Sequence, residues 1–167
     1  MELLQTFVDD FLVPFGGNPE FGLFLFVWLF SVVNPLAPPE EAITLLGGAC
    51  MAMGLLHPFW GWLAIVAGII VTDMSQYWIG RGVLKVLTGT RLGNRFIGSR
   101  GFRDARRKMA EKGVWAIVAC RFFFGTRAVT YVASGFLRYS FAKFVLVDGL
   151  MVLLQGSLFI LMGAVFS

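Results

Sequence analysis

The chain has 167 residues, of which 57% are hydrophobic and 14% charged, and its mean hydropathy is +0.77. A soluble domain carries about 25% charged residues, so this composition excludes an ordinary soluble domain and indicates one integral membrane domain, residues 1–167. The net charge is +4, and ten of the fourteen basic residues lie between Arg81 and Lys112. Nucleic acid is a weak explanation in so apolar a chain, whereas the positive-inside rule places residues 81–112 in the cytoplasm.

Residues 1–17 are apolar apart from a few polar and acidic positions, which include Asp9 and Asp10. This stretch is too short and too charged to cross a bilayer, so we expect an interfacial helix. No basic residue lies within it, so we expect no cleavable signal peptide. Residues 21–33 are uncharged and predict a first span, entered from the cytoplasm.

Residues 42–72 contain no Asp, Glu, Lys or Arg. At roughly 1.5 Å per residue, a straight helix of this length would exceed a hydrocarbon core of about 30 Å. The chain must therefore turn back, and glycines together with His57-Pro58 supply the break. We predict a re-entrant hairpin over residues 34–55 and a full span over residues 59–80. Such a hairpin is tolerated at membrane depth only when it is buried in protein or lines a wet cavity.

Within the basic segment 81–112, Phe102, Ala105 and Met109 share one face of a predicted helix, opposite basic residues. Two interpretations stay open for this helix. It lies on anionic lipid, or it is a solvated determinant of topology.

Residues 113–137 form another apolar run, which Gly125 and a later Ser-Gly pair interrupt. This pattern predicts a second re-entrant hairpin over 113–137. Residues 141–166 predict the last span, which contains the carboxylate of Asp148.

Arg121 and Arg127 are the only charged residues within 113–137. An arginine at membrane depth costs a few kcal/mol even on the mildest scale, so such residues face protein or water and mark a pathway or an anion site. The alternative is that they extend to the headgroup layer. Arg127 is farther than Arg121 from the nearer end of the run, which favours the anion site.

Residues 41–48 resemble residues 127–135, and the spacing from Gly54 to Gly68 equals that from Gly135 to Gly149. With the basic segment in the cytoplasm, the two hairpins open to opposite sides, which is the inverted repeat of many secondary transporters. The predicted fold class is therefore an all-α membrane protein. It consists of an inverted repeat of two re-entrant helical hairpins, each followed by a transmembrane helix, plus an N-terminal interfacial helix and a first span.

In this arrangement the broken segments meet near the bilayer midplane. Glu40 and Glu41 are then expected to approach Arg121 and Arg127, since opposite charges lower the cost of burying each other.

Over residues 33–163 the sequence resembles the DedA family of bacterial membrane proteins, relatives of the eukaryotic VTT-domain lipid scramblases. Three motifs in order carry the resemblance: Pro38-Pro39-Glu40-Glu41 with Gly47; Asp73, Tyr77 and Ile79-Gly80-Arg81; and Arg121-Phe122, Arg127 and Ser134-Gly135. The chain departs from the family pattern at Phe124, Pro39, Asp148 and Trp28, where the family has proline, glycine, asparagine and, in some members, glutamate.

The resemblance implies translocation of a phosphate-headed lipid across the bacterial inner membrane. Undecaprenyl phosphate is the leading substrate, and phosphatidylethanolamine or another phospholipid is the alternative. Arg121 and Arg127 are the expected phosphate ligands, because guanidinium suits phosphate oxygens. The expected proton carriers are Glu40, then Glu41, then Asp73, with the proton motive force as the energy source.

Two other classes of function stay open. A membrane enzyme would need a nucleophile with a base, but His57 is the only histidine, and no Gly-x-Ser-Gly surrounds Ser134. We therefore expect no enzyme, no metal and no cofactor. In a non-transporting scaffold, the charges would only lock the hairpins together. The sequence leaves the oligomeric state open.

Overall fold

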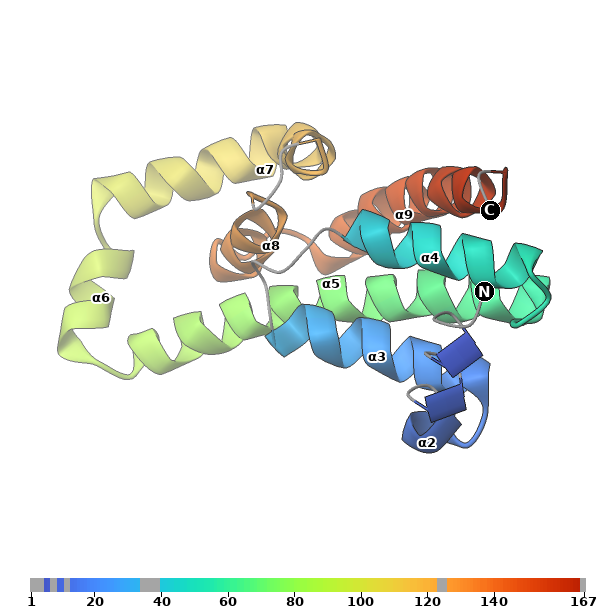
Figure 1. The fold of residues 1–167 in the computed structure, drawn as a ribbon. Coiled ribbons are helices and arrows are strands. Elements are labelled where there is room, and N and C mark those ends of the chain that lie inside the picture. The colour runs from blue at the N-terminus through green and yellow to red at the C-terminus, as the bar shows by residue number, and fades with distance from the viewer. Residues whose placement is uncertain (1–4, 7–8, 11–12, 34–39, 123–125, 166–167) are drawn as a thin grey trace. The chain divides into compact units, whose positions relative to one another are not determined.

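The computed structural model describes residues 5–6, 9–10, 13–33, 40–122 and 126–165 (Figure 1). Every regular element within these ranges is helical, which confirms the all-α prediction. The helices are α2 (Val13–Gly16), α3 (Pro19–Val33), α4 (Glu40–Ala52), α5 (Pro58–Thr88), α6 (Arg91–Ile97), α7 (Arg100–Cys120), α8 (Thr126–Phe136) and α9 (Phe141–Val165). Residues 1–4, 7–8 and 11–12 of the expected interfacial helix lie outside the described residues, and so do the sequence positions Pro38, Pro39, Phe124 and Gly125.

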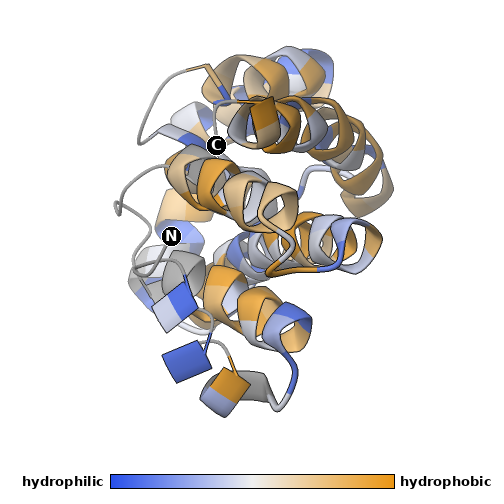
Figure 2. Cartoon of the chain, turned by 45° about the vertical axis from the view of Figure 1, so that its right-hand side comes forward, coloured by the Kyte–Doolittle hydropathy of each residue, from blue (hydrophilic) through white to orange (hydrophobic). Residues whose placement is uncertain are grey.

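Two helices in the described part of the chain, α5 and α9, are long and apolar enough to cross a membrane. Helix α5 contains the predicted span 59–80 and continues to Thr88, where buried Leu84 extends its inward face. Helix α9 covers the predicted span 141–166 up to Val165, the last described residue. By contrast, α3 has 15 residues, or about 22 Å, which is shorter than a hydrocarbon core of about 30 Å. Hydrophobic positions cover most of the helical ribbon (Figure 2).

The chain divides into two compact units, and α5 and α9 each contribute to both. The first unit comprises Met1–Thr72 and Leu150–Ser167, and the second comprises Asp73–Gly149. A core of aliphatic, Met and Cys side chains holds the first unit together: Leu23, Val27, Cys50, Met51, Leu56, Ile65, Val66, Ile69, Val152 and Ile160.

Within the first unit, α4 crosses the C-terminal half of α9 at two glycines. A Cβ on Gly48 would overlap the carbonyl oxygen of Ile160, and a Cβ on Gly163 would overlap the carbonyl oxygen of Leu45. The numbering rises along one helix as it falls along the other, so the helices are antiparallel at this crossing. Small residues let backbones approach this closely, as is common between membrane helices.

The second unit contains a crossing of the same kind between α8 and the C-terminal half of α5. A Cβ on Gly135 would overlap the carbonyl oxygen of Tyr77, and one on Gly80 would overlap the carbonyl oxygen of Val132. These two helices are also antiparallel. Each unit therefore contains one crossing with the same pattern. Each helix contributes one glycine and, three residues before it, the carbonyl group that the glycine of the other helix contacts.

The helices α4 and α8 also end in the same way, with a residue in the left-handed region, Gly54 at φ 75° and Arg138 at φ 59°. Both ends are Schellman motifs, which satisfy carbonyl groups that the helix leaves unpaired. The bonds that close them are Leu55 N to Cys50 O and Tyr139 N to Ser134 O, both 2.9 Å, and Gly54 N to Met51 O and Arg138 N to Gly135 O, both 3.1 Å.

Helix α7 begins in the segment expected to be a basic loop and continues to Cys120 without a break at Gly113. Gly113 lies inside the helix against the ring of Tyr139, where a Cβ would lie 2.5 Å from a ring carbon, so this close contact requires a glycine. Phe102 and Met109, predicted to share one helical face, are buried in the protein, whereas Ala105 of the same predicted face is exposed. The segment between α5 and the second hairpin is therefore mostly helical.

Candidate functional site

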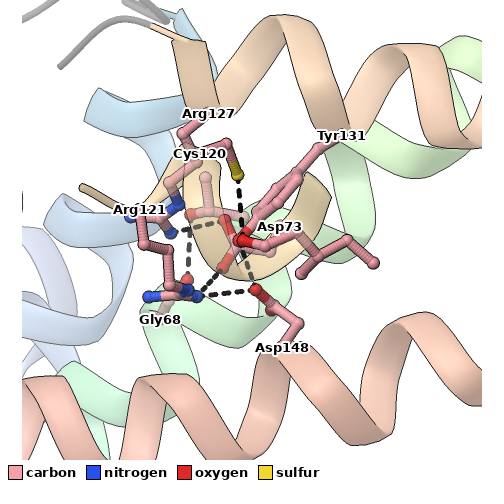
Figure 3. Close-up of polar contacts among 9 residues, drawn as sticks. Gly68, Asp73, Cys120, Arg121, Arg127, Tyr131 and Asp148 are labelled. Atoms are coloured by element: carbon pink, nitrogen blue, oxygen red, sulfur yellow. Dashed lines mark hydrogen bonds and ion pairs between the residues drawn. The ribbon is translucent and has the colours of Figure 1, made fainter. Parts of the chain in front are cut away.

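Asp73 lies at the centre of a buried cluster of charges in the second unit (Figure 3). Its Oδ2 accepts a hydrogen bond from Arg121 Nη2 at 3.1 Å, and its Oδ1 accepts one from Arg127 Nη2 at 2.5 Å. The Asp73 side chain is completely buried. One carboxylate from α5 therefore joins an arginine that follows α7 to an arginine of α8.

Asp148 of α9 is the second carboxylate of this cluster. Its Oδ1 accepts a hydrogen bond from Arg121 Nη2 at 2.6 Å and another from the hydroxyl of Tyr131. Asp148 and Tyr131 are both buried. Charge-assisted contacts of this kind are the strong hydrogen bonds of a protein interior, and four helices of the second unit supply them.

Local structure explains where the two arginines stand. Arg121 is the C-cap residue of α7, where a cation is stabilised by the negative end of the helix dipole. Arg127 is the second residue of α8, where the positive end of the dipole disfavours a cation and favours an anion. Arg127 therefore depends on Asp73, and the start of α8 is suited to receiving an anion.

The two arginines differ in accessibility. The side chain of Arg121 is 4% exposed, whereas that of Arg127 is 19% exposed. The guanidinium of Arg127 also lies 5.5 Å from the centre of the Tyr131 ring, within cation–π range. Arg127 is thus the more reachable cation of the cluster.

Buried aromatic side chains pack next to the charged cluster. Tyr77, Tyr131 and Phe144 are fully buried, and Phe144 lies 5.1 Å from the Tyr77 ring and 5.0 Å from the Tyr131 ring. The Tyr77 hydroxyl donates to the carbonyl oxygen of Tyr139 at 2.6 Å. Packed apolar rings of this kind lower the local dielectric and so strengthen electrostatic interactions beside them.

The structure brings together three of the residues expected from the sequence, Arg121, Arg127 and Asp73. Glu40 and Glu41 begin α4 in the first unit, and their side chains lie outside the described part of the chain. Their approach to the arginines stays a prediction.

Sequence reasoning gave no role in the site to Asp148 or Tyr131. A carboxylate inside an apolar span is a functional candidate on its own, so Asp148 had a usable signal. Tyr131 had none, because a tyrosine is common in apolar sequence, and only its packing reveals that its hydroxyl is bonded to Asp148.

The chain was compared with known proteins. The model of a protein family described as the VTT domain matches residues 38–165. An uncharacterized membrane protein of Haemophilus influenzae is 28% identical over 144 residues, which cover 83% of this chain and 66% of the relative. An uncharacterized membrane protein of Synechocystis sp. is 34% identical over 110 residues, which cover 65% of this chain and 50% of the relative. The match thus spans half to two thirds of these relatives' length, and no solved structure matches.

Proposed function

Because the chain belongs to the VTT-domain family of membrane proteins, we propose that it translocates a phosphate-headed lipid across the bacterial cytoplasmic membrane. Undecaprenyl phosphate is the first proposed substrate, and phosphatidylethanolamine is the alternative. The observation that carries the proposal is the buried cluster of Arg121, Arg127 and Asp73. An anionic head that crosses hydrocarbon needs fixed cations in a polar site, and ionisable residues at membrane depth mark such routes.

In this mechanism the positive charge of the two arginines attracts the phosphate while the lipid tail stays among the acyl chains. Arginine presents planar, bidentate donors to phosphate oxygens. The N-terminus of α8, next to Arg127, adds backbone N–H groups and the positive end of the helix dipole. These contributions converge on the start of α8.

We further propose that α3–α4 and α7–α8 are the two re-entrant hairpins, and that α5 and α9 are the spans that follow them. The paired glycine crossings and the matching Schellman ends support a repeated unit. With the basic segment in the cytoplasm, the two repeats have opposite orientation. The first hairpin then begins at Pro19 instead of residue 34, because α3 is too short to span.

The crossings also set a register between the repeats that differs from the one expected from the sequence. Gly48 and Gly135 make equivalent contacts, and each follows a charged residue by eight positions, Glu40 (48 − 40) and Arg127 (135 − 127). Opposite charges thus occupy related positions in the two hairpins. This register favours Glu40 over Glu41 as the acidic partner.

Transport of an anion toward the cytoplasm works against an inside-negative potential, at about 2.3 kcal/mol per charge per 100 mV. A proton carried along would offset this cost. Asp73 contacts both arginines, so its protonation would also change their hold on a phosphate. Glu40, Glu41 and Asp73 are the proposed proton carriers.

The test is a flip assay in proteoliposomes of purified protein with polyprenyl phosphate, phosphatidylethanolamine and phosphatidylglycerol, each with and without a proton gradient. We expect polyprenyl phosphate to move fastest and to respond to the gradient. Movement of phosphatidylethanolamine alone would establish the alternative. Absence of movement for every lipid would contradict translocation.

A further inference from the structure

The proposed phosphate site contains two arginines that are held in different ways. Arg121 bridges two aspartates through a single nitrogen, since Nη2 donates to Asp73 Oδ2 at 3.1 Å and to Asp148 Oδ1 at 2.6 Å. Its side chain is 4% exposed, compared with 19% for Arg127. An anion that enters from outside the cluster therefore reaches Arg127 first.

Asp148 is itself fixed by a second donor. Its Oδ1 receives the hydroxyl of Tyr131 as well as the guanidinium of Arg121, and these donors come from different segments, α8 and the end of α7. Tyr131 is fully buried and packs against Phe144 of α9. The carboxylate of Asp148 therefore has little freedom to leave Arg121.

We propose that Asp148, held by Tyr131, is a positioning residue that serves as the fixed counter-ion of Arg121 and leaves Arg127 as the guanidinium that contacts the phosphate. This division of roles rests on the proposed function of the site. Arg121 acts through Asp73, which it orients toward Arg127, and a lipid phosphate replaces part of the hold of Asp73 on Arg127 (Figure 3).

Loss of the Asp148 charge should change the affinity for phosphate in the opposite direction from damage to the fold. Asp148→Asn removes one negative charge beside Arg121 and keeps the shape of the side chain. Arg121 then attracts an anion more strongly, so a phosphate binds more tightly and leaves more slowly. A residue that only supports the fold would instead weaken binding and transport together when it is replaced.

The experiment measures two quantities on the full chain, the affinity for a short-chain polyprenyl phosphate in nanodiscs and the initial rate of its movement in proteoliposomes. For Asp148→Asn we expect about threefold to tenfold tighter binding together with slower movement. Tyr131→Phe should change both quantities in the same direction but less. It removes the hydroxyl that holds Asp148 against Arg121, but Asp148 keeps its charge and the aromatic ring beside Arg127 stays. Asp104→Asn, an exposed carboxylate on α7, is the matched control and should change neither.

The two arginines supply the second comparison. Arg127→Lys should weaken binding about tenfold, since a lysine loses the bidentate contact, whereas Arg121→Lys should weaken it by about threefold or less. Equal losses for the two lysine variants would overturn the division of roles. Weaker or unchanged phosphate binding in both Asp148→Asn and Tyr131→Phe would overturn the positioning role of Asp148. If Asp148→Asn does not fold, the binding measured for Tyr131→Phe decides the question.

The wild-type protein separates this inference from the function on which it rests. If the wild type neither binds nor moves the probe, the proposed function fails and the inference fails with it. If the wild type binds and moves the probe but the variants behave alike, the inference alone is wrong.

Discussion

The two glycine crossings have the same backbone geometry but different surroundings. In the first unit, α4 and α9 cross among apolar side chains such as Cys50 and Ile160. In the second unit, α8 and α5 cross beside Asp73 and Arg127, both drawn from the crossing helices. Among the residues whose side chains the structure describes, none at the first crossing is charged, so close packing there does not require charges. Glu40, at the position related to Arg127, lies outside that set. The charges of the second unit therefore call for a reason other than packing, and the reason that we propose is phosphate binding.

The largest difference in the free energy of unfolding is expected between the loss of a buried charge and the loss of a buried apolar side chain. Asp73→Ala leaves two arginines without their shared carboxylate, so we expect the free energy of unfolding to fall by about 3–5 kcal/mol. Val152→Ala, at a similarly buried position in the first unit, should cost about 2 kcal/mol. Thermal or denaturant unfolding in detergent measures both, and equal losses would show that the cluster is no more demanding than ordinary core.

Alanine at the crossing glycines tests whether the two crossings are equivalent. Gly48→Ala and Gly135→Ala each place a Cβ against a backbone carbonyl, and we expect each to lower the free energy of unfolding by about 2–3 kcal/mol. Gly82→Ala, on α5 with open space around it, is the control and should be neutral or stabilising by up to about 1 kcal/mol. A loss confined to one crossing would remove the packing evidence for a repeated unit.

The loss of a single hydrogen bond should lower the free energy of unfolding by more similar amounts in the two units. Tyr77→Phe removes a buried bond to the carbonyl oxygen of Tyr139, and Trp62→Phe removes a partly buried bond to the hydroxyl of Ser157. We expect losses in the free energy of unfolding of about 1.5 kcal/mol and about 1 kcal/mol respectively, because the acceptor left in the second unit is more deeply buried. The reverse order would show that the burial of the acceptor does not set the cost of losing the bond.

The smallest effects are expected at the two Schellman ends, and they should have opposite signs. Arg138→Gly relieves a side chain in the left-handed region and should raise the free energy of unfolding by about 1 kcal/mol. Gly54→Ala introduces such a side chain and should lower it by a similar amount. Changes of the same sign would mean that the two helix ends are not equivalent.

The sequence was sufficient for the parts of the fold that follow from composition and chain reach. The uncharged runs predicted α5 and α9, and glycine with His57-Pro58 marked the break between α4 and α5. The interruption predicted at Ser134-Gly135 is instead inside α8, which ends at Phe136.

The sequence predicts that the first hairpin begins at residue 34. Our proposal that it begins at Pro19 rests on the 15-residue length of α3, which no signal in the sequence fixes. The sequence predicts a helix around Phe102 and Met109 within the basic segment, but it predicts neither α6 nor the continuation of that helix to Cys120. Helix α7 joins a charged half to an apolar half, and no single pattern covers both.

The site was predictable in part. Arg121 and Arg127 stood out because charge is rare in apolar sequence, and Asp73 stood out for the same reason. The pairing of Asp73 with both arginines, and of Asp148 with Arg121 and Tyr131, depends on how four helices pack. Side-chain contacts over such separations in the chain leave no periodic trace in one sequence.

Phosphate translocation through Arg127 is the central claim, and one series of flip assays tests it most directly. Wild type, Arg127→Lys and Arg127→Ala are reconstituted in equal amounts, and the initial rate of polyprenyl phosphate movement is measured for each. We expect Arg127→Lys to keep a small fraction of the wild-type rate and Arg127→Ala to lose it, with all three proteins equally inserted in the membrane. Wild-type rates in both variants would show that Arg127 does not take part in transport.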